Sequence, residues 1–367
     1  MSGGPQPAPR ILELVPYQPG RPVEEVEREL GLSGTIKAAS NENALGPSPR
    51  VVAAIAASAA SVHRYPDGAA FSLVGRLAQH LDVAASRIVV GNGSNEVLEL
   101  LARIFVEPGD EVLCSEFSFV VYRLVAVAAG GRAVLVPAKG LAHDLDAMAD
   151  AIGERTRIIF LANPNNPTGT FFDRGAWRRF LARVPEHICV VLDEAYAEFV
   201  DEPGYASGLE DLDAHPGLVV VRTFSKAYSL AGLRLGYAVA PVTIADAFAR
   251  VREPFNTNLI AQAAAIAALD DVDHLERSKT LVRQSRVRWT SAIARLDLEA
   301  GPTVANFVLL EVGDGARVAQ AMLARGVIVR PVAPYGLPSM IRVTFGTEEE
   351  DVRAIEALQA AIEEVRA

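Results

Sequence analysis

The stretch Arg87-Ile88-Val89-Val90-Gly91-Asn92-Gly93-Ser94-Asn95-Glu96 is the part of the sequence that best defines the fold class. Its first four residues predict a buried strand, and the glycine-rich segment after them predicts a turn. The next residues predict an amphipathic helix, whose apolar face is formed by Val97, Leu98, Leu101 and Phe105. A strand, a glycine-rich turn and a helix in this order are typical of an α/β protein.

The same alternation continues along the chain. Short apolar strands are expected at 111–114, 133–136, 157–162, 188–192, 218–221 and 235–240, with helical segments between several of them. Strands that are apolar throughout and separated by helices indicate a mostly parallel sheet covered on both faces. We therefore expect an α/β fold with a large domain built on a mostly parallel, seven-stranded sheet.

A different pattern begins after about residue 257. An alanine-rich helical stretch, 261–294, is followed by elements expected at 306–311 (strand), 316–325 (helix), 327–331 (strand) and 340–344 (strand). In the final helix, Val352, Ile355, Leu358 and Ile362 recur at helical spacing. This pattern predicts a smaller α+β domain. We expect residues 1–40 to form a tail and an arm against the small domain, 41–260 the large domain, and 261–367 a linking helix and the small domain.

Composition excludes several classes of protein. The formal net charge of the 367 residues is −10, and no basic block is present, so a nucleic-acid surface is not expected. No apolar run reaches the roughly 18 residues that cross a membrane, and the N-terminus has no signal pattern, so we expect a cytoplasmic protein. Cys114 and Cys189 lie in apolar strands and are interpreted as buried free thiols. No histidine has metal-ligand spacing, so no metal site is expected.

Two charged residues follow apolar strands and are candidates for chemistry. Lys226 lies in Thr223-Phe224-Ser225-Lys226, directly after a strand, although a lone lysine there is usually a surface residue. Asp193 ends the run Val190-Val191-Leu192, where a carboxylate is costly unless it has a partner. Ligands of open α/β sheets bind at the carboxyl ends of strands. A helix cap is the alternative interpretation of Asp193.

Two loops also favour a ligand-binding site at the carboxyl ends of the strands. The loop Ala162-Asn163-Pro164-Asn165-Asn166-Pro167-Thr168-Gly169 follows a strand and is unusually rich in Asn and Pro, although it could be an ordinary turn. The turn 91–96 suits a phosphate, because glycines allow close approach and the helix N-terminus supplies amide donors. A dinucleotide site would need a third glycine where Glu96 stands, so a nicotinamide dehydrogenase fits less well.

Taken together, these segments resemble the fold-type I pyridoxal-phosphate (PLP) aminotransferases. The motifs Asn163–Gly169, Asp193–Tyr196 and Ser225-Lys226-(seven residues)-Arg234 occur in that family's order. More narrowly, the chain resembles the histidinol-phosphate aminotransferase family. That resemblance rests on the segments 16–20, 39–43, 64–68, 329–331 and 341–347. One departure is Ala44, where the family usually has proline near the substrate entrance.

The resemblance implies roles for residues around the cofactor. Lys226 would form the Schiff base with PLP and then carry the proton between substrate and cofactor. Asp193 would pair with the ring nitrogen, Asn166 and Tyr196 would bind the ring oxygen, and Phe119 would stack on the ring. The cofactor phosphate would be bound by Ser94, Asn95, Ser225 and Arg234, with Tyr65 reaching it from the partner of a homodimer.

The resemblance also implies the substrates. Arg342 would bind the carboxylate of glutamate, while Arg330 and Tyr17 would bind the phosphate of histidinol phosphate, with Asn43 as a further substrate-binding residue. The expected reaction is transamination between glutamate/2-oxoglutarate and histidinol phosphate/imidazole-acetol phosphate, in histidine biosynthesis. Alternatives on the same fold are an aromatic amino-acid aminotransferase and a decarboxylase of a phosphorylated amino acid. A non-catalytic PLP-binding module is a further alternative.

Overall fold

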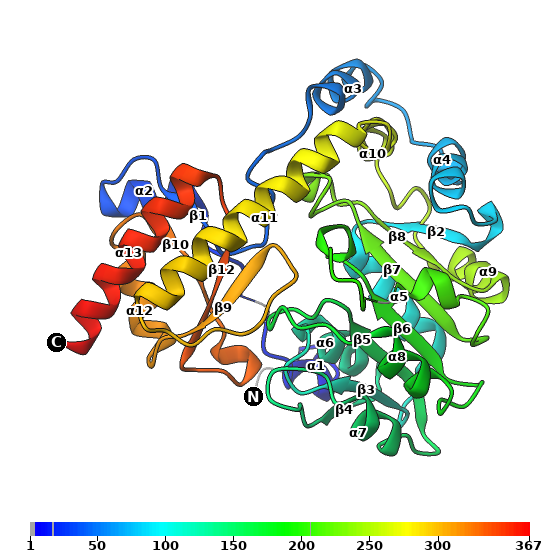
Figure 1. The fold of residues 1–367 in the computed structure, drawn as a ribbon. Helices are drawn as coiled ribbons and strands as arrows, with labels where there is room; N and C mark the ends of the chain where they lie inside the picture. The colour runs from blue at the N-terminus through cyan, green and yellow to red at the C-terminus, as the bar shows by residue number, and fades with distance from the viewer. Residues whose placement is uncertain (1–3, 17, 206) are drawn as a thin grey trace.

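A large twisted sheet is the central element of the fold (Figure 1). The computed structural model describes residues 4–16, 18–205 and 207–367. Seven strands lie in the order β2-β8-β7-β6-β5-β3-β4. Their bounds are β2 Ile88–Gly91, β3 Glu111–Ser115, β4 Arg132–Val136, β5 Thr156–Ala162, β6 Cys189–Asp193, β7 Leu218–Thr223 and β8 Gly236–Val239. β8 runs antiparallel to its two neighbours, β2 and β7, and the other neighbouring strands pair in parallel, so the predicted mostly parallel, seven-stranded sheet is confirmed.

Helices cover both faces of this sheet. Neighbouring residues of each strand point to opposite sides, and both sets of side chains are apolar. Val191 and Val219 pack on one face, in the apolar cluster that includes Tyr122. Val190 and Val220 pack on the other face, in a second cluster. The first face is covered by α5 Ser94–Phe105, α6 Val120–Ala129 and α9 Val242–Val251. The second is covered by α3 Pro49–Ala59, α4 Phe71–Leu81, α7 Leu145–Asp150, α8 Arg174–Leu181 and α10 Leu259–Leu269.

A smaller α+β unit follows, as expected. Its antiparallel sheet has the order β11-β12-β9, with bounds β9 Phe307–Glu311, β11 Arg330–Pro331 and β12 Met340–Thr344. Its helices are α11 Val272–Arg295, α12 Gly315–Leu323 and α13 Glu348–Arg366. Trp289, Phe307, Ile341 and Leu358 meet in one buried cluster between the helices and the sheet. Figure 1 shows this unit beside the larger sheet, with α11 leading from one to the other.

The structure corrects details of the predicted elements in this unit. The helical stretch expected at 261–294 is two helices, because Asp271 caps α11 by accepting a hydrogen bond from the His274 amide at 3.2 Å. The strand expected at 327–331 is also two, since β10 Val327–Ile328 pairs with β1 Ile36–Lys37 whereas β11 pairs with β12.

In the last helix, Val352 is one of the four apolar residues at helical spacing, yet it is 45% exposed. The neighbouring Asp351 is buried instead. Its carboxylate accepts a hydrogen bond from Trp289 Nε1 at 2.9 Å and forms an ion pair with Arg288 at 2.8 Å. These partners offset the cost of burying the charge, and the helix turns the adjacent valine outward.

The N-terminal segment contacts both parts of the molecule. In α1 Pro9–Leu12, Arg10 Nε donates to the carbonyl of Ala128 in α6 at 3.5 Å. In α2 Val23–Leu30, Val26 packs with Leu323 and Ile328 of the smaller unit. The division of the chain at residues 40 and 260 stays a prediction. Within the described ranges, no helix is both long and apolar enough to cross a membrane.

Candidate active site

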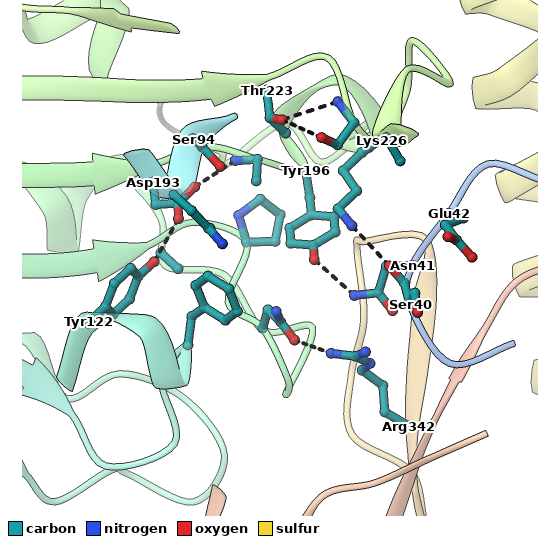
Figure 2. Close-up of a pocket in the computed structure, with 18 of the residues that line it drawn as sticks. Ser40, Asn41, Glu42, Ser94, Tyr122, Asp193, Tyr196, Thr223, Lys226 and Arg342 are labelled. Carbon is teal, nitrogen blue, oxygen red and sulfur yellow. Dashed lines mark hydrogen bonds between the residues drawn. The ribbon is translucent and has the colours of Figure 1, made fainter. Parts of the chain in front are cut away.

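A cavity of about 330 Å³ opens at the carboxyl ends of β5, β6 and β7, facing the smaller unit. Its volume lies in the range of small-ligand sites. Figure 2 shows how its side chains converge from both sheets and from the segment before α3. Ten residues singled out from the sequence line it, namely Ser94, Asn95, Phe119, Asn166, Asp193, Tyr196, Ser225, Lys226, Arg234 and Arg342.

Asp193 lies at the end of β6, and only 5% of its surface is exposed. Its carboxylate accepts hydrogen bonds from the Tyr122 hydroxyl at 2.9 Å and from the Ala195 amide at 3.1 Å. Burial raises the pKa of Asp193 to about 6, although these two hydrogen bonds oppose the rise. Among the described residues, no lysine or arginine forms an ion pair with this carboxylate. A cationic ring nitrogen would therefore suit this position.

Lys226 follows β7 and projects into the cavity (Figure 2). Its Nζ donates to the backbone carbonyl of Ser40 at 3.0 Å. Burial lowers the pKa of Lys226 to about 8, and the positive charge of Arg342 adds to the fall. A substantial fraction of the amine is therefore neutral near physiological pH, as a nucleophilic or proton-carrying lysine requires.

A group of anion-binding donors lies at the start of α5. Arg234 Nη1 donates to Ser225 Oγ at 3.4 Å, and Thr223 Oγ1 donates to the same oxygen at 3.0 Å. Gly93 has a φ of +83°, and a Cβ atom there would collide with the Arg234 guanidinium. Gly93 caps α5 and no side chain accepts a hydrogen bond from its first amides, while Ser94 and Asn95 line the cavity. This set of donors fits a phosphate group.

Arg342 comes from β12 of the smaller unit, and 4% of its surface is exposed. Its guanidinium donates to Asn166 Oδ1 and, at 2.7 Å, to the carbonyl of Ala39. It also lies 5.3 Å from the centre of the Phe307 ring. A guanidinium held in this way presents a fixed charge that suits a carboxylate.

The structure also brings in residues that the sequence reasoning did not select. Ser40, Asn41, Tyr122 and Thr223 line the cavity. Tyr122 and Asp193 are 71 positions apart, and no spacing signal joins them. Ser40 and Asn41 belong to the segment 39–43, on which the family resemblance partly rests. That resemblance could have indicated that they lie near the site.

Four predicted residues lie away from the cavity wall or outside the described structure. Asn43 lines a neighbouring cavity, where its Nδ2 donates to the carbonyl of Ala227 at 3.1 Å and to Ser278 Oγ at 2.8 Å. Arg330 pairs in register with Arg342 and lines a third cavity. Tyr65 is 82% exposed. Tyr17 lies outside the described residues.

Among the described residues, no cysteine lines the cavity. Cys114 and Cys189 are both buried and free, which confirms the interpretation from the sequence. Burial raises the pKa of the Cys114 thiol to about 11, so this thiol is protonated near neutral pH. In the ranges that the structure describes, no group of three or more His, Cys, Asp or Glu side chains could hold a metal ion.

Comparison with known proteins identifies the family. The sequence model described as "Aminotransferase class I and II" matches residues 33–358, and the chain belongs to this family. Among curated relatives, histidinol-phosphate aminotransferase 1 of Nitrosococcus oceani is 48% identical over 354 residues, which cover 96% of each chain. The histidinol-phosphate aminotransferase of Anaeromyxobacter sp. is 49% identical over 95% of this chain and 97% of the relative.

A solved structure is similar over nearly the whole chain. It is the histidinol-phosphate aminotransferase of Sinorhizobium meliloti in complex with pyridoxal-5'-phosphate, with a TM-score of 0.90 and 32% identity over 99% of both chains. The likeness confirms the fold-type I α/β architecture expected from the sequence.

Proposed function

We propose that this chain is a PLP-dependent aminotransferase that exchanges an amino group between glutamate/2-oxoglutarate and histidinol phosphate/imidazole-acetol phosphate, as a step of histidine biosynthesis. One observation carries the proposal. A single cavity joins a lysine of lowered pKa, a buried carboxylate, and a phosphate-binding group at the start of α5. The names of the similar relatives support histidinol phosphate as one of the substrates.

The cavity residues fit the parts of the cofactor. Lys226 would attach PLP, and Asp193 would pair with the ring nitrogen. Asn166 and Tyr196 would hydrogen-bond the ring oxygen, while Phe119 would stack on the ring face. When bound, PLP supplies an electron sink for the substrate α-carbon. The cofactor phosphate is assigned to Ser94, Asn95, Ser225 and Arg234, all of which line the cavity.

The protein's own residues provide the proton transfer. Burial lowers the pKa of the free Lys226 amine to about 8, so this amine would take up a proton and return it near neutral pH. The carbonyl of Ser40 is placed to receive one of its N–H groups. Arg342 orients the substrate carboxylate, since its guanidinium is fixed by Asn166 and Ala39.

Arg330 is proposed to receive the phosphate of histidinol phosphate. We expect Arg330→Gln to raise the KM for histidinol phosphate about tenfold to a hundredfold, because a hydrogen bond to a charged group contributes about 1.5–3 kcal/mol. The half-reaction with glutamate should stay nearly unchanged. Steady-state and half-reaction kinetics measure both effects. Arg317→Gln, at an exposed arginine of the neighbouring α12, is the matched control.

A substrate panel tests the assignment itself. The wild-type enzyme should transaminate histidinol phosphate with a higher kcat/KM than phenylalanine, the substrate of the aromatic alternative. A kcat/KM for phenylalanine at least as high would overturn the histidinol-phosphate assignment. Carbon dioxide release from a phosphorylated amino acid would instead favour the decarboxylase.

A homodimer with shared active sites is also part of the proposal. Tyr65 stacks on Phe255 with 4.7 Å between ring centres, yet it is 82% exposed. Phe71, at the start of α4, is 80% exposed. Contiguous exposed apolar surface is typical of an interface, and the stacked Tyr65 and Phe255 rings, both exposed, form such a surface. A role for Tyr65 at the partner's cofactor phosphate, and a cytoplasmic location, stay predictions.

Mixing inactive variants tests the shared site. Dimers formed from Lys226→Ala and Tyr65→Ala chains should regain activity, because one of the two sites in each mixed dimer keeps both residues. Random pairing is expected to restore about a quarter of wild-type activity. A mixture of Lys226→Ala and Asp193→Ala chains is the control, since both changes affect the chain's own cavity. Equal recovery in the two mixtures, or none in the first, would contradict the assignment of Tyr65.

A further inference from the structure

Asn41 has an unusual backbone conformation. This residue was not selected from the sequence. Its φ is +54°, and only 1% of its surface is exposed. Left-handed backbone is uncommon for residues other than glycine, although asparagine tolerates it better than most. Its backbone is held from two sides. Its amide donates to Thr344 Oγ1 at 2.9 Å, and its carbonyl accepts from Asn306 Nδ2 at 3.1 Å. Both partners belong to the smaller unit.

The Asn41 side chain is oriented by the same threonine. Because Thr344 Oγ1 accepts the Asn41 amide proton, its own hydroxyl proton can go to Asn41 Oδ1, which lies 3.2 Å away. The side-chain nitrogen of Asn41, Nδ2, must then point away from Thr344. It donates to the hydroxyl oxygen of Tyr196 at 2.9 Å (Figure 2).

This contact has a consequence for Tyr196. An amide nitrogen only donates, so the phenol oxygen must be the acceptor, and the single phenol proton is directed elsewhere. In the parts of the chain that the structure describes, no group accepts that proton. The Tyr196 side chain lines the cavity, so the proton is available to a ligand there.

The phenol keeps its proton at neutral pH. Burial raises the pKa of Tyr196 above its ordinary value, while Arg342 and the hydrogen bond from Asn41 oppose the rise. The other ionisable groups that influence it are Asp193 and Tyr335. Lys226 Nζ lies 5.8 Å from the centre of its ring. Tyr196 is therefore a neutral hydrogen-bond donor within a site of mixed charge.

We infer that Asn41 is a positioning residue that commits the Tyr196 hydroxyl to donate its proton to an aromatic oxyanion bound in the cavity. The inference rests on the proposed function, in which this oxyanion is the ring oxygen of PLP. A hydrogen bond donated to the anionic form of that oxygen stabilises it, which holds down the pKa of the bound chromophore. Asn41 would thus act on the cofactor through Tyr196.

Two substitutions at Asn41 separate this role from simple packing. Asn41→Asp keeps the size of the side chain but presents only acceptors, so the Tyr196 proton turns toward it and away from the cofactor. Asn41→Gly accepts a φ of +54° without strain and removes the contact, which leaves Tyr196 free to donate to the cofactor. A purely structural role predicts that glycine is the more harmful change. The inference predicts that aspartate is.

The measurements are the PLP dissociation constant of the cofactor-free protein and the pH midpoint of the visible absorption change of the holoenzyme. For Asn41→Asp we expect the midpoint to rise by about one pH unit and PLP to bind about tenfold more weakly. Asn41→Gly should shift the midpoint by less than half as much. An aspartate variant that shifts no further than the glycine variant would overturn the inference.

The same substitution in a Tyr196→Phe background completes the test. Tyr196→Phe alone should raise the midpoint, and Asn41→Asp should add little to it, because the two residues act through one hydroxyl. A full further shift in that background would assign the effect to the aspartate charge and overturn the inference. If Tyr196→Phe shifts the midpoint and Asn41→Asp does not, the role of Asn41 fails while that of Tyr196 stands. If Tyr196→Phe leaves it unchanged, the proposed role of Tyr196 fails as well.

Discussion

Replacing Lys226 by alanine is expected to lower the rate of both half-reactions by at least about a thousandfold, because the variant loses the attachment point of the cofactor and the group that carries the proton. The lowered pKa of Lys226, about 8, and its position within the cavity suit both of its proposed roles. Single-turnover absorbance changes with glutamate measure the loss. Exposed Lys139 provides the matched control, as Lys139→Ala should retain full activity.

A chemical experiment locates the attachment independently of rates. Borohydride reduction of the wild-type holoenzyme should fix the cofactor to one peptide, and mass spectrometry should place it on Lys226. An adduct on another lysine, or a Lys226→Ala variant with wild-type rates, would refute the assignment of PLP attachment to Lys226.

Replacing Asp193 by asparagine is expected to lower kcat about a hundredfold or more, since the neutral side chain no longer holds the ring nitrogen in its protonated form. The same substitution should instead make the cofactor-free protein more stable to unfolding at neutral pH. Burial raises the pKa of Asp193 from 3.8 to about 6. The folded state therefore favours the protonated carboxyl, and the charged form is the costly one.

The sign of the pH dependence follows from that shift. The stability contributed by protonated Asp193 is complete below about pH 4 and is lost as the pH rises through about 6. Each pKa unit corresponds to about 1.4 kcal/mol, so the loss amounts to roughly 2–3 kcal/mol.

Asp193→Asn should not lose stability in this way, because asparagine does not ionise. Its cofactor-free form should therefore melt at a higher temperature than wild type above pH 6. Thermal melts from pH 4 to 8 measure this. Asp213→Asn, at an exposed aspartate paired with Arg87, should melt like wild type throughout. A variant at Asp193 that is less stable than wild type at pH 8 would contradict the proposed cost of the charge.

Much of the site could be predicted from the sequence because its residues follow strands. Asp193 ends β6 and Lys226 follows β7, and the carboxyl ends of parallel strands meet at one edge of a sheet. Apolar runs and turn residues also placed most strands within two residues of their observed bounds, and β12 spans the predicted 340–344.

The remaining features depend on contacts between distant parts of the chain. Nothing local indicates that β8 runs antiparallel to β7, or that Tyr122 reaches the Asp193 carboxylate. In the segment 39–43 the sequence reasoning selected Asn43, whereas Asn41 lines the cavity. A linear motif does not say which side chain turns inward. The break at Asp271 was different, since an aspartate cap was visible in the sequence.

The segment 39–41 has a further consequence for how the protein is made. The contacts at Asp193, Ser225 and Arg234 can all form once the chain has been synthesised through β8. Ala39 and Asn41, however, must wait for Arg342 and Thr344, which lie more than 300 positions later. A growing chain folds its N-terminal part first. On the ribosome, a nascent chain can therefore form most of the proposed cofactor site while Arg342, the proposed receptor for the substrate carboxylate, is still to be translated.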